Sequence, residues 1–263
     1  MRSDGESPRW MQVFIYQDRG FTREFCDRAY SSNFEALVLT IDSQILGKRE
    51  RDIKNSFLAP PRFTVSDYVN FLAKYKWLWR MRSHLNRISF GNYINEVKKK
   101  GVSTGETAVA DMLDTAITWK DVEWLRKIWK KPLILKGILN PDDVKSALAS
   151  GVDGIIVSNH GGRQLDCVVS SIDALPEIID NIEGKIPVFM DGGIRRGADI
   201  VKVLALGAKA CLIGRPHLWG LAVGGELGVE KVISILHDEV DLTMGLCGIS
   251  SISEISKDLI RKI

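Results

Sequence analysis

Short apolar segments alternate with helical ones along most of this sequence, and this alternation restricts the fold more than any other feature. The apolar runs are rich in β-branched residues, as expected of strands buried on both faces of a parallel sheet. Alternation with helices indicates parallel strands joined by right-handed crossovers. The predicted strands cover 11–16, 36–42, 133–136, 154–158, 186–191 and 210–214. The predicted helices cover 21–33, 119–129, 141–150, 170–181 and 196–206.

Polar residues able to do chemistry follow several of these strands at their carboxyl ends. They are Thr40, Asp42, Lys136, His160, Asp191 and Arg215. A TIM-type (β/α)8 barrel gathers its active-site residues at this edge, whereas a doubly wound open sheet groups them at one switch point. We therefore predict an α/β fold of the TIM-barrel type. Because six strands are recognisable and nothing before Trp10 resembles a strand, the first two strands of the barrel are expected to be lacking.

The length of 263 residues suits one partial barrel domain over 1–263. The alternation stops after the second predicted strand, so residues 57–118 are predicted to form an insertion. Within it, residues 74–100 carry a local charge of +7 in a chain whose net charge is +3, so the basic character is local.

The cysteines bear on compartment and metal binding. Cys26, Cys167, Cys211 and Cys247 are scattered without zinc-ligand spacing, which favours a reducing compartment and no metal site. No signal peptide or apolar run of membrane-spanning length is recognisable. We therefore expect a cytoplasmic protein.

The strongest motif covers residues 158–166, S-N-H-G-G-R-Q-L-D, and directly follows a predicted strand. His160 can exchange a proton near neutral pH, Arg163 keeps its charge, and two glycines let a bulky partner approach the backbone. The motif predicts a site that combines a base with a cation. A lone histidine, by contrast, is more often structural.

Two further turns, each containing glycine and arginine, indicate an anion site. Residues 191–197, D-G-G-I-R-R-G, run from a strand end into a helix start, where backbone N–H groups and the helix dipole attract anions. Residues 213–216, I-G-R-P, follow one βα unit later, and neighbouring barrel loops of this kind commonly share one phosphate. The terminal phosphate of a cofactor fits this site. The alternative is that the glycines serve only tight turns.

Together these motifs resemble those of the FMN-dependent 2-hydroxy-acid dehydrogenases and oxidases. The resemblance also includes residues 204–216, L-A-L-G-A-K-A-C-L-I-G-R-P, and extends from Trp10 to about Ile252. Residues 47–52, 55–57 and 119–129, with Cys167, are most similar to the L-lactate and (S)-mandelate dehydrogenases. The resemblance implies a TIM barrel, FMN as cofactor and a small 2-hydroxy acid as substrate.

The resemblance also implies roles for individual residues at the substrate. His160 would be the base that takes a proton from the substrate, with Asp42 holding its ring. Arg163 and Arg49 would bind the substrate carboxylate, which suits the planar guanidinium group.

Other residues are expected to bind the cofactor. Lys136 would offset the negative charge of the reduced flavin ring, and Asp191 would bind the ribityl chain. Gln12 and Thr40 would form hydrogen bonds with the flavin ring. The residues expected at the phosphate and its turns are Gly193, Arg195, Gly214 and Arg215.

The sequence departs from the family pattern in two places. Phe14 stands where the family usually has a tyrosine, so a hydroxyl that would touch the substrate is missing. The first two strands of the family barrel, which carry another substrate tyrosine and part of the flavin wall, have no counterpart. The chain is therefore expected to be a truncated form or a fragment of a longer protein.

The insertion carries its own signal. Residues 75–82, Y-K-W-L-W-R-M-R, interleave aromatic and cationic side chains, a composition suited to a membrane interface. Relatives in the dehydrogenase branch use this insertion to reach the membrane and its quinone, which implies peripheral contact with the inner face of the cell membrane through residues 64–100. A solvated loop over the active site is the alternative. No nucleic-acid-binding module is recognisable.

Two hypotheses of function follow. The first is FMN-dependent oxidation of an L-2-hydroxy acid of the lactate or mandelate type to the 2-oxo acid, with electrons passed to a quinone or another respiratory acceptor, or to oxygen in an oxidase. The second is a truncated, non-catalytic pseudoenzyme or assembly partner, because open sheet edges favour association. A homo-oligomer is expected. His160 together with Arg163 disfavours another FMN barrel such as an isomerase.

Overall fold

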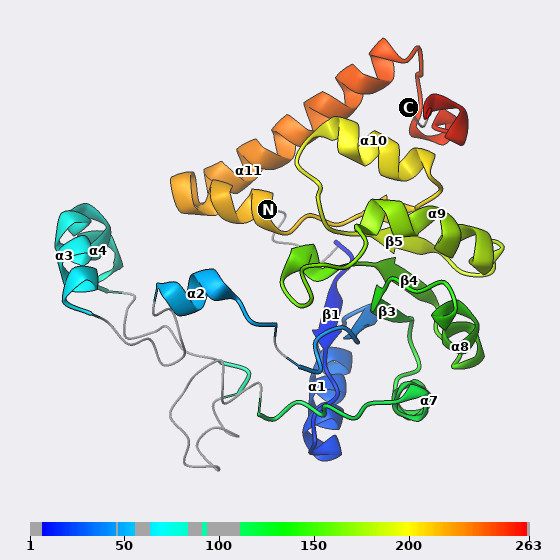
Figure 1. The fold of residues 1–263 in the computed structure, drawn as a ribbon, viewed down its shortest axis with the longest axis horizontal. Coiled ribbons are helices and arrows are strands. Elements are labelled where there is room, and N and C mark those ends of the chain that lie inside the picture. The colour runs from blue at the N-terminus through cyan, green and yellow to red at the C-terminus, as the bar shows by residue number, and fades with distance from the viewer. Residues whose placement is uncertain (1–6, 46, 56–63, 84–90, 94–110, 262–263) are drawn as a thin grey trace.

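The computed structural model describes residues 7–45, 47–55, 64–83, 91–93 and 111–261 (Figure 1). Its centre is one sheet of six strands in the order β1-β2-β3-β4-β5-β6, and every neighbouring pair is parallel. The strands are β1 (Trp10–Val13), β2 (Ala36–Thr40), β3 (Leu133–Ile138), β4 (Gly154–Val157), β5 (Val188–Met190) and β6 (Ala210–Cys211). The predicted parallel strands are therefore confirmed, although most are shorter than the sequence suggested.

Helices cover the outer face of this sheet, as the alternation predicted (Figure 1). They are α1 (Arg19–Ser31), α7 (Trp119–Ile128), α8 (Asp143–Ala149), α9 (Ser171–Ile182) and α10 (Gly197–Ala205). Helix α1 begins before the predicted position because Asp18 is its N-cap, with Oδ1 accepting from the N–H groups of Gly20 at 2.8 Å and Phe21 at 3.3 Å.

The two faces of the sheet differ in their packing. Residues such as Leu37, Leu135 and Ile155 point outward and pack beneath the helices in the main core. The inner face carries a smaller cluster of Ala36, Val38, Ile134 and Ile156, with Phe189 and Leu212 against it. The rings of Trp10 in β1 and Phe189 in β5 meet edge to face with centroids 5.2 Å apart, so the sheet curls until these strands approach across its interior. The result is half of a barrel.

The structure also contains helices that the sequence analysis did not predict. The short ones are α2 (Glu50–Lys54), α3 (Val65–Ala73), α4 (Tyr75–Met81) and the 3-10 turns His160–Gly162, Ile252–Glu254 and Lys257–Leu259. The long one is α11 (Arg215–Leu246), which is broken at Gly225, where φ is 61°. The chain folds back there, and the backbones of Gly220 and Gly228 approach so closely that neither has room for a Cβ atom. The glycines that disfavour one straight helix thus permit the packing of two.

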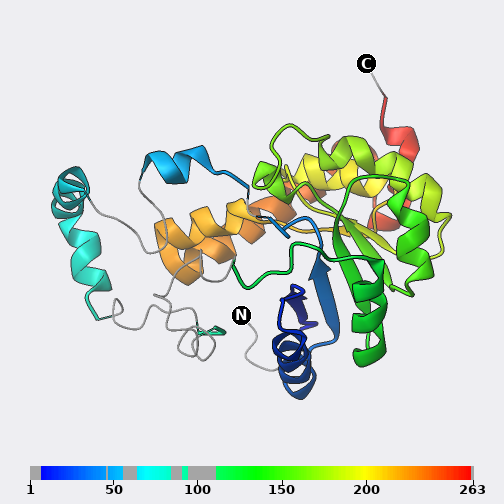
Figure 2. The same ribbon diagram turned by 60° about the horizontal axis from the view of Figure 1, so that its bottom comes forward.

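The predicted insertion at 57–118 lies partly outside the described residues. Tyr93 is packed against α1, where its ring contacts Phe21 and Phe25 and its hydroxyl lies 2.8 Å from that of Tyr16. Burial raises the pKa of Tyr16, so its phenol stays protonated. By contrast, α3 and α4 lie away from the sheet in both ribbon views (Figures 1 and 2).

The end of the insertion is held by Arg19 of α1. Its Nη2 lies 2.5 Å from Asp114 Oδ2 and 2.7 Å from Asp121 Oδ1 at the start of α7. The backbone N–H of Ala116 and the Arg19 guanidinium lower the pKa of Asp114. This contact fixes where the chain returns to the sheet.

Gly137 creates the space that Asp42 occupies beside the sheet. The pairing of β3 with β4 shifts register between Lys136 and Ile138, and Gly137 at this bulge has a φ of +109°. A Cβ atom at Gly137 would lie 2.7 Å from both Cβ and Cγ of Asp42. The bulge therefore brings β3 against the Asp42 side chain.

Gly137→Ala is expected to destabilise the fold by about 1–3 kcal/mol, because an L side chain rarely adopts this φ and would collide with Asp42. Urea unfolding measures the change in the free energy of unfolding. The control is Gly245→Ala in α11, where a Cβ meets open space and the change should be about 1 kcal/mol or less, in the stabilising direction. Equal changes in the free energy of unfolding for the two substitutions would contradict the requirement for glycine at position 137.

Candidate active site

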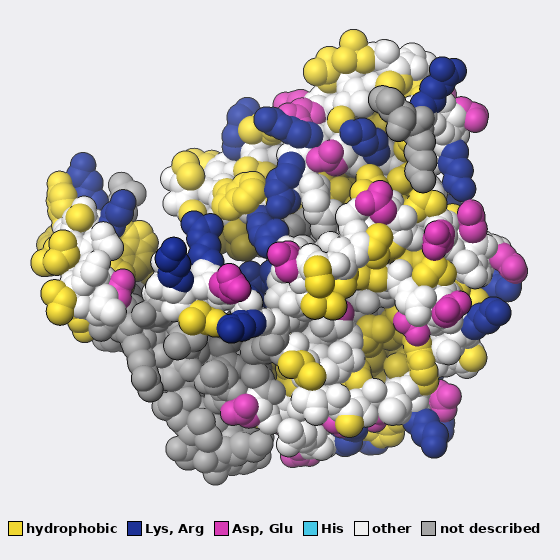
Figure 3. Space-filling view, viewed as in Figure 1, with side chains coloured by type: hydrophobic (Ala, Val, Ile, Leu, Met, Phe, Trp, Pro, Cys, Tyr) yellow, Lys and Arg dark blue, Asp and Glu magenta, His cyan; other side chains and the backbone are white. Residues whose placement is uncertain are grey.

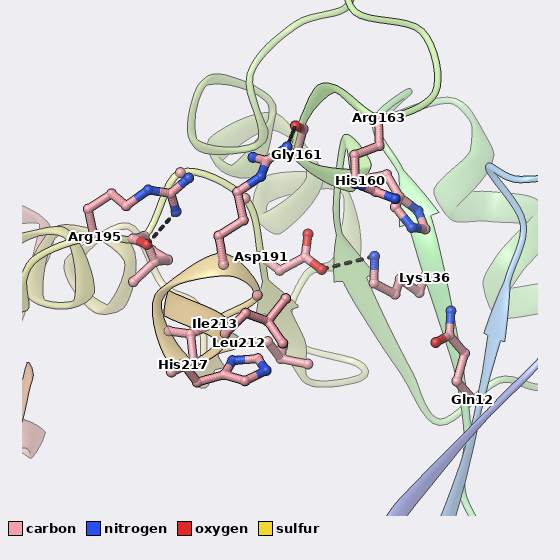
Figure 4. Close-up of a pocket in the computed structure, with 16 residues that line it drawn as sticks. Gln12, Lys136, His160, Gly161, Arg163, Asp191, Arg195, Leu212, Ile213 and His217 are labelled. Atoms are coloured by element: carbon pink, nitrogen blue, oxygen red, sulfur yellow. Dashed lines mark hydrogen bonds and ion pairs between the residues drawn. The ribbon is translucent and has the colours of Figure 1, made fainter. Parts of the chain in front are cut away.

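A cavity of about 470 Å³ lies at the carboxyl ends of the strands, with residues of β1, β3 and the loops after β4, β5 and β6 around it (Figure 4). Most of the residues predicted for the site line it. They are Gln12, Lys136, His160, Arg163, Asp191, Gly193, Arg195, Gly214 and Arg215. The structure thus brings together residues as far apart in the sequence as Gln12 and Arg215.

The three other predicted site residues adjoin this cavity without lining it. Thr40 Oγ1 accepts from Gln12 Nε2 at 2.7 Å, and Asp42 contacts the ring of His160. Arg49 lines a neighbouring charged pocket, together with Arg163 and Arg215. The two arginines predicted to bind the carboxylate therefore share one pocket.

His160 is held in one orientation by Asp42. Its Nδ1 lies 3.1 Å from Oδ1 and 3.2 Å from Oδ2 of that carboxylate. The residue sits in the left-handed region with a φ of 55°, and its backbone N–H donates to Ser158 Oγ at 3.0 Å. Because a carboxylate can only accept, Nδ1 carries the proton. In the neutral ring, Nε2 then holds the lone pair that a general base requires.

Lys136 and Asp191 form an ion pair at the cavity wall (Figure 4). Lys136 Nζ lies 2.9 Å from Asp191 Oδ2, and the side chains are only 13% and 18% exposed. Lys136 also donates to Ser158 Oγ at 2.7 Å. The other carboxylate oxygen, Asp191 Oδ1, is buried and has no hydrogen-bond partner in the part of the chain that the structure describes. An acceptor left unsatisfied beside a cavity fits a ligand hydroxyl, such as one on the ribityl chain of FMN.

The opposite end of the cavity suits an anion. Gly193, with a φ of +81°, and Gly214 both border open space, so a ligand can approach their backbones. Helix α11 begins at Arg215 and directs its N-terminal dipole here. The Arg195 guanidinium lies 5.1 Å from the ring centroid of Trp219, and Arg215 Nη2 donates to the carbonyl of Gly161 at 2.9 Å. This donor set fits the phosphate of FMN.

The structure adds site residues to which the sequence analysis gave no role. Ser158 connects Lys136 to the backbone of His160, and His217 lines the cavity from the first turn of α11. Ser43 Oγ donates to the Asp42 carboxylate, and Gln164 in turn donates to Ser43 Oγ. Ser158 and Gln164 are inside the quoted motif, but their side chains could have served any loop, so only their spatial neighbours reveal them.

Comparison with known proteins identifies the family. A model described as FMN-dependent dehydrogenase matches residues 1–262. The chain belongs to this FMN-dependent dehydrogenase family. It is 46% identical over 249 residues to the L-lactate oxidase of Nostoc sp., covering 95% of this chain and 63% of that protein. It is 40% identical over 257 residues to 2-hydroxyacid oxidase 1 of Homo sapiens, covering 98% of this chain and 65% of that protein.

Solved structures agree with this assignment. The structure of the monotopic membrane protein (S)-mandelate dehydrogenase aligns with a TM-score of 0.85 and 33% identity, covering 97% of this chain and 67% of that one. The predicted family, its FMN dependence and the partial TIM-type barrel are thereby confirmed. The chain spans less than two thirds of the length of each of the two curated relatives named above.

Lys136→Met is expected to lower the free energy of unfolding by about 1–3 kcal/mol, because it leaves the Asp191 carboxylate half-buried without its cation. Urea unfolding of the chain measures this. The matched control is Lys185→Met, which removes an ion pair to Glu183 whose side chains are 57% and 66% exposed, and should change stability by about 0.5 kcal/mol or less. Equal losses would show that the Lys136 pair has no special weight.

Proposed function

We propose that this chain supplies the base, the carboxylate-binding arginines and the FMN-binding residues for oxidation of an L-2-hydroxy acid to the 2-oxo acid. The observation that carries the proposal is the shared cavity, in which the Asp42-held His160 faces the same space as the Lys136–Asp191 pair. A base alone would fit many enzymes. Its combination with an unsatisfied acceptor and an anion site supports a flavin mononucleotide enzyme. The names of the relatives support substrates of the lactate or mandelate type.

The substrate would lie between the His160 ring and the arginines. Arg163 and Arg49 would bind its carboxylate with paired hydrogen bonds, fixing C2 and its hydroxyl relative to Nε2 of His160. His160 takes up one proton, and Asp42 stabilises the resulting imidazolium. In a carbanion route this proton comes from C2, and in a hydride route it comes from the hydroxyl.

FMN, when bound, supplies the acceptor for the two electrons. Lys136 would balance negative charge on the reduced ring, and Gln12 and Thr40 would hydrogen-bond the ring edge. Asp191 Oδ1 would accept from a ribityl hydroxyl, which satisfies its unused capacity. The phosphate would lie at Gly193, Arg195, Gly214 and Arg215.

The relatives are named either as dehydrogenases or as oxidases, so their names support different final electron acceptors. We propose a quinone or another respiratory carrier, supported by the likeness to a membrane-bound mandelate dehydrogenase and by the exposed aromatic surface of α3 and α4. Oxygen is the alternative, supported by the relatives that are named oxidases. Comparing the rates at which dioxygen and a soluble quinone reoxidise the reduced protein separates the two.

A non-catalytic assembly partner is the second candidate function. β1 and β6 are the edges of the sheet, so one side of each has no strand neighbour among the described residues. Leu218, Trp219 and Leu221 near β6 are each more than half exposed. Both features favour association, including the expected homo-oligomer, without requiring catalysis.

His160→Gln is expected to leave FMN binding intact and to slow flavin reduction by lactate or mandelate on the order of 10²- to 10⁴-fold, because the amide cannot take the proton. The flavin absorption of the purified chain with added FMN reports binding, and its anaerobic bleaching reports reduction. His237→Gln is the control, since His237 is exposed on α11 and its ring faces the exposed Asp241. Undiminished bleaching in His160→Gln would remove His160 as the base. A wild-type chain that binds no FMN would favour the second candidate.

We also propose that α3 and α4 contact a membrane surface. Tyr68, Tyr75 and Trp79 are each at least 60% exposed, and Arg82 lies over the ring of Trp79 at 3.7 Å. Hydrophobic and basic side chains lie together on the surface of the part of the chain that contains α3 and α4, at the left of Figure 3. Aromatic rings at headgroup depth with cations beside them suit an anionic interface. Within the described residues no helix is both long and apolar enough to span a bilayer.

Trp77→Ser combined with Trp79→Ser is expected to reduce binding to phosphatidylglycerol vesicles on the order of tenfold or more, because two large apolar side chains no longer enter the interface. Flotation with such vesicles measures the bound fraction, and phosphatidylcholine vesicles test the charge dependence. Leu242→Ser with Leu246→Ser, two exposed residues of α11, is the control. Equal flotation of all three proteins would contradict membrane contact through α3 and α4.

A further inference from the structure

Gln164 joins the loop after β4 to the loop after β2. Its Nε2 donates to Ser43 Oγ at 2.6 Å, and its Oε1 accepts from the backbone N–H of Gly47 at 2.8 Å. Ser43 directly follows Asp42 in the sequence, and Gly47 precedes Arg49 by two residues. One side chain therefore contacts both parts of the β2 loop that the proposed reaction uses.

The two loops are in direct contact at this bridge. A Cβ atom on Gly47 would overlap the backbone carbonyl oxygens of Arg163 and Gln164, so only glycine fits. Ser43 is 4% exposed. Because water has little access to this hydroxyl, a lost partner is not replaced without cost. The Gln164 bridge thus lies at the contact between the two loops, and Gln164 itself lines the charged pocket of Arg49 and Arg163.

The backbone N–H of Gly47 can only donate, and this fixes the direction of each hydrogen bond at the bridge. The Gly47 N–H must face Gln164 Oε1, which turns Nε2 toward Ser43. Ser43 Oγ accepts that bond, and its single proton goes to Asp42 Oδ1 at 3.1 Å. The other neighbour of this hydroxyl, His160 Nδ1 at 3.4 Å, already carries a proton for Asp42 and cannot accept. The chain of bonds therefore ends with two donors on the Asp42 carboxylate.

We propose that Gln164 and Ser43 are positioning residues of the active site. The bonds from Gln164 through Ser43 hold the Asp42 carboxylate against Nδ1 of His160, which keeps Nε2 of that ring available as the base. The bond from Gly47 to Gln164 keeps the loop that bears Arg49 in register with the loop that bears Arg163. This inference rests on the proposed function, in which His160 is the base.

Substitutions at the two residues should separate kcat from KM. Ser43→Ala removes the donor to Asp42 but leaves the Gly47 bond, so kcat should fall on the order of tenfold with KM nearly unchanged. Gln164→Glu keeps the size and still accepts from Gly47, but its carboxylate draws the Ser43 proton away from Asp42, so the same pattern is expected. Gln164→Leu removes both bonds and should lower kcat and also raise KM. Ser43→Thr retains the hydroxyl and should restore kcat.

The control is Ser150→Ala. Ser150 is also buried, but its hydroxyl donates to the Ser146 carbonyl at the end of α8, at the other end of the neighbouring strand β4. This substitution should leave kcat and KM unchanged. All rates are divided by the FMN content of each protein, so that weaker folding is not counted as slower chemistry. A merely structural role would give Ser43→Ala and Ser150→Ala the same kinetics, which would overturn the inference.

A second readout does not depend on turnover or on FMN. The Nδ1 proton of His160, assigned as the low-field imidazole resonance that His160→Gln removes, should exchange with water several-fold faster in Ser43→Ala and Gln164→Glu than in the wild type or Ser150→Ala. Equal exchange in all of them, or no such resonance in the wild type, would overturn the inference. If this pattern holds but the wild type oxidises no 2-hydroxy acid, the proposed function alone fails. If the wild type is active and the variants match it, the positioning role alone fails.

Discussion

The geometry of the site depends on the ion pair that Lys136 forms with Asp191 across the end of the sheet. Lys136 stands on β3, Asp191 follows β5, and Ser158 at the end of β4 lies between them, accepting from Lys136 and from the His160 backbone. One ammonium group thus connects the acceptor predicted to bind a ribityl chain with the loop that carries the proposed base, His160. A carboxylate and a lysine this poorly exposed are tolerated because each satisfies the other. Among the described residues Asp191 Oδ1 has no hydrogen-bond partner, so this carboxylate keeps an acceptor that a ligand could use.

The sequence predicts the sheet and most of the site because both depend on local signals. β-branched runs mark the strands, and the residues that follow them are brought to one edge by the parallel topology alone. The contact between Ser43 and Gln164 could not be predicted from such local signals. The two residues are 121 residues apart and meet only because Gly47 lets two loops touch, which no periodicity reports. Helix α11 could not be predicted for another reason. Its glycines disfavour a helix locally, and they are needed because the backbones of Gly220 and Gly228 lie in close contact.

The insertion shows how one composition can serve two purposes. Its sequence is rich in aromatic residues, which predicted a membrane surface without saying which rings would reach it. Tyr93 packs into the aromatic cluster beside α1 and ties the insertion to the barrel wall. Trp77 and Trp79 on α4 remain about half exposed or more, away from the sheet. Tyr93 therefore contributes to the fold, whereas Trp77 and Trp79 can serve as an interaction surface.

The position of the cavity relative to the sheet edges explains how a partial barrel can bring most of the predicted site residues together. Gln12 belongs to the edge strand β1, whereas Gly214 and His217 follow the other edge strand, β6, and all three line the same cavity. The cavity is therefore lined from both edge strands, while the proposed base, its carboxylate partner and the two proposed carboxylate-binding arginines come from the loops after β2 and β4. These inner strands have neighbours on both sides, so their loops are fixed by full ladders. Among the described residues β1 and β6 are each paired on one side, so the part of the cavity that they border depends more on the state of the sheet edges than the position of His160 does.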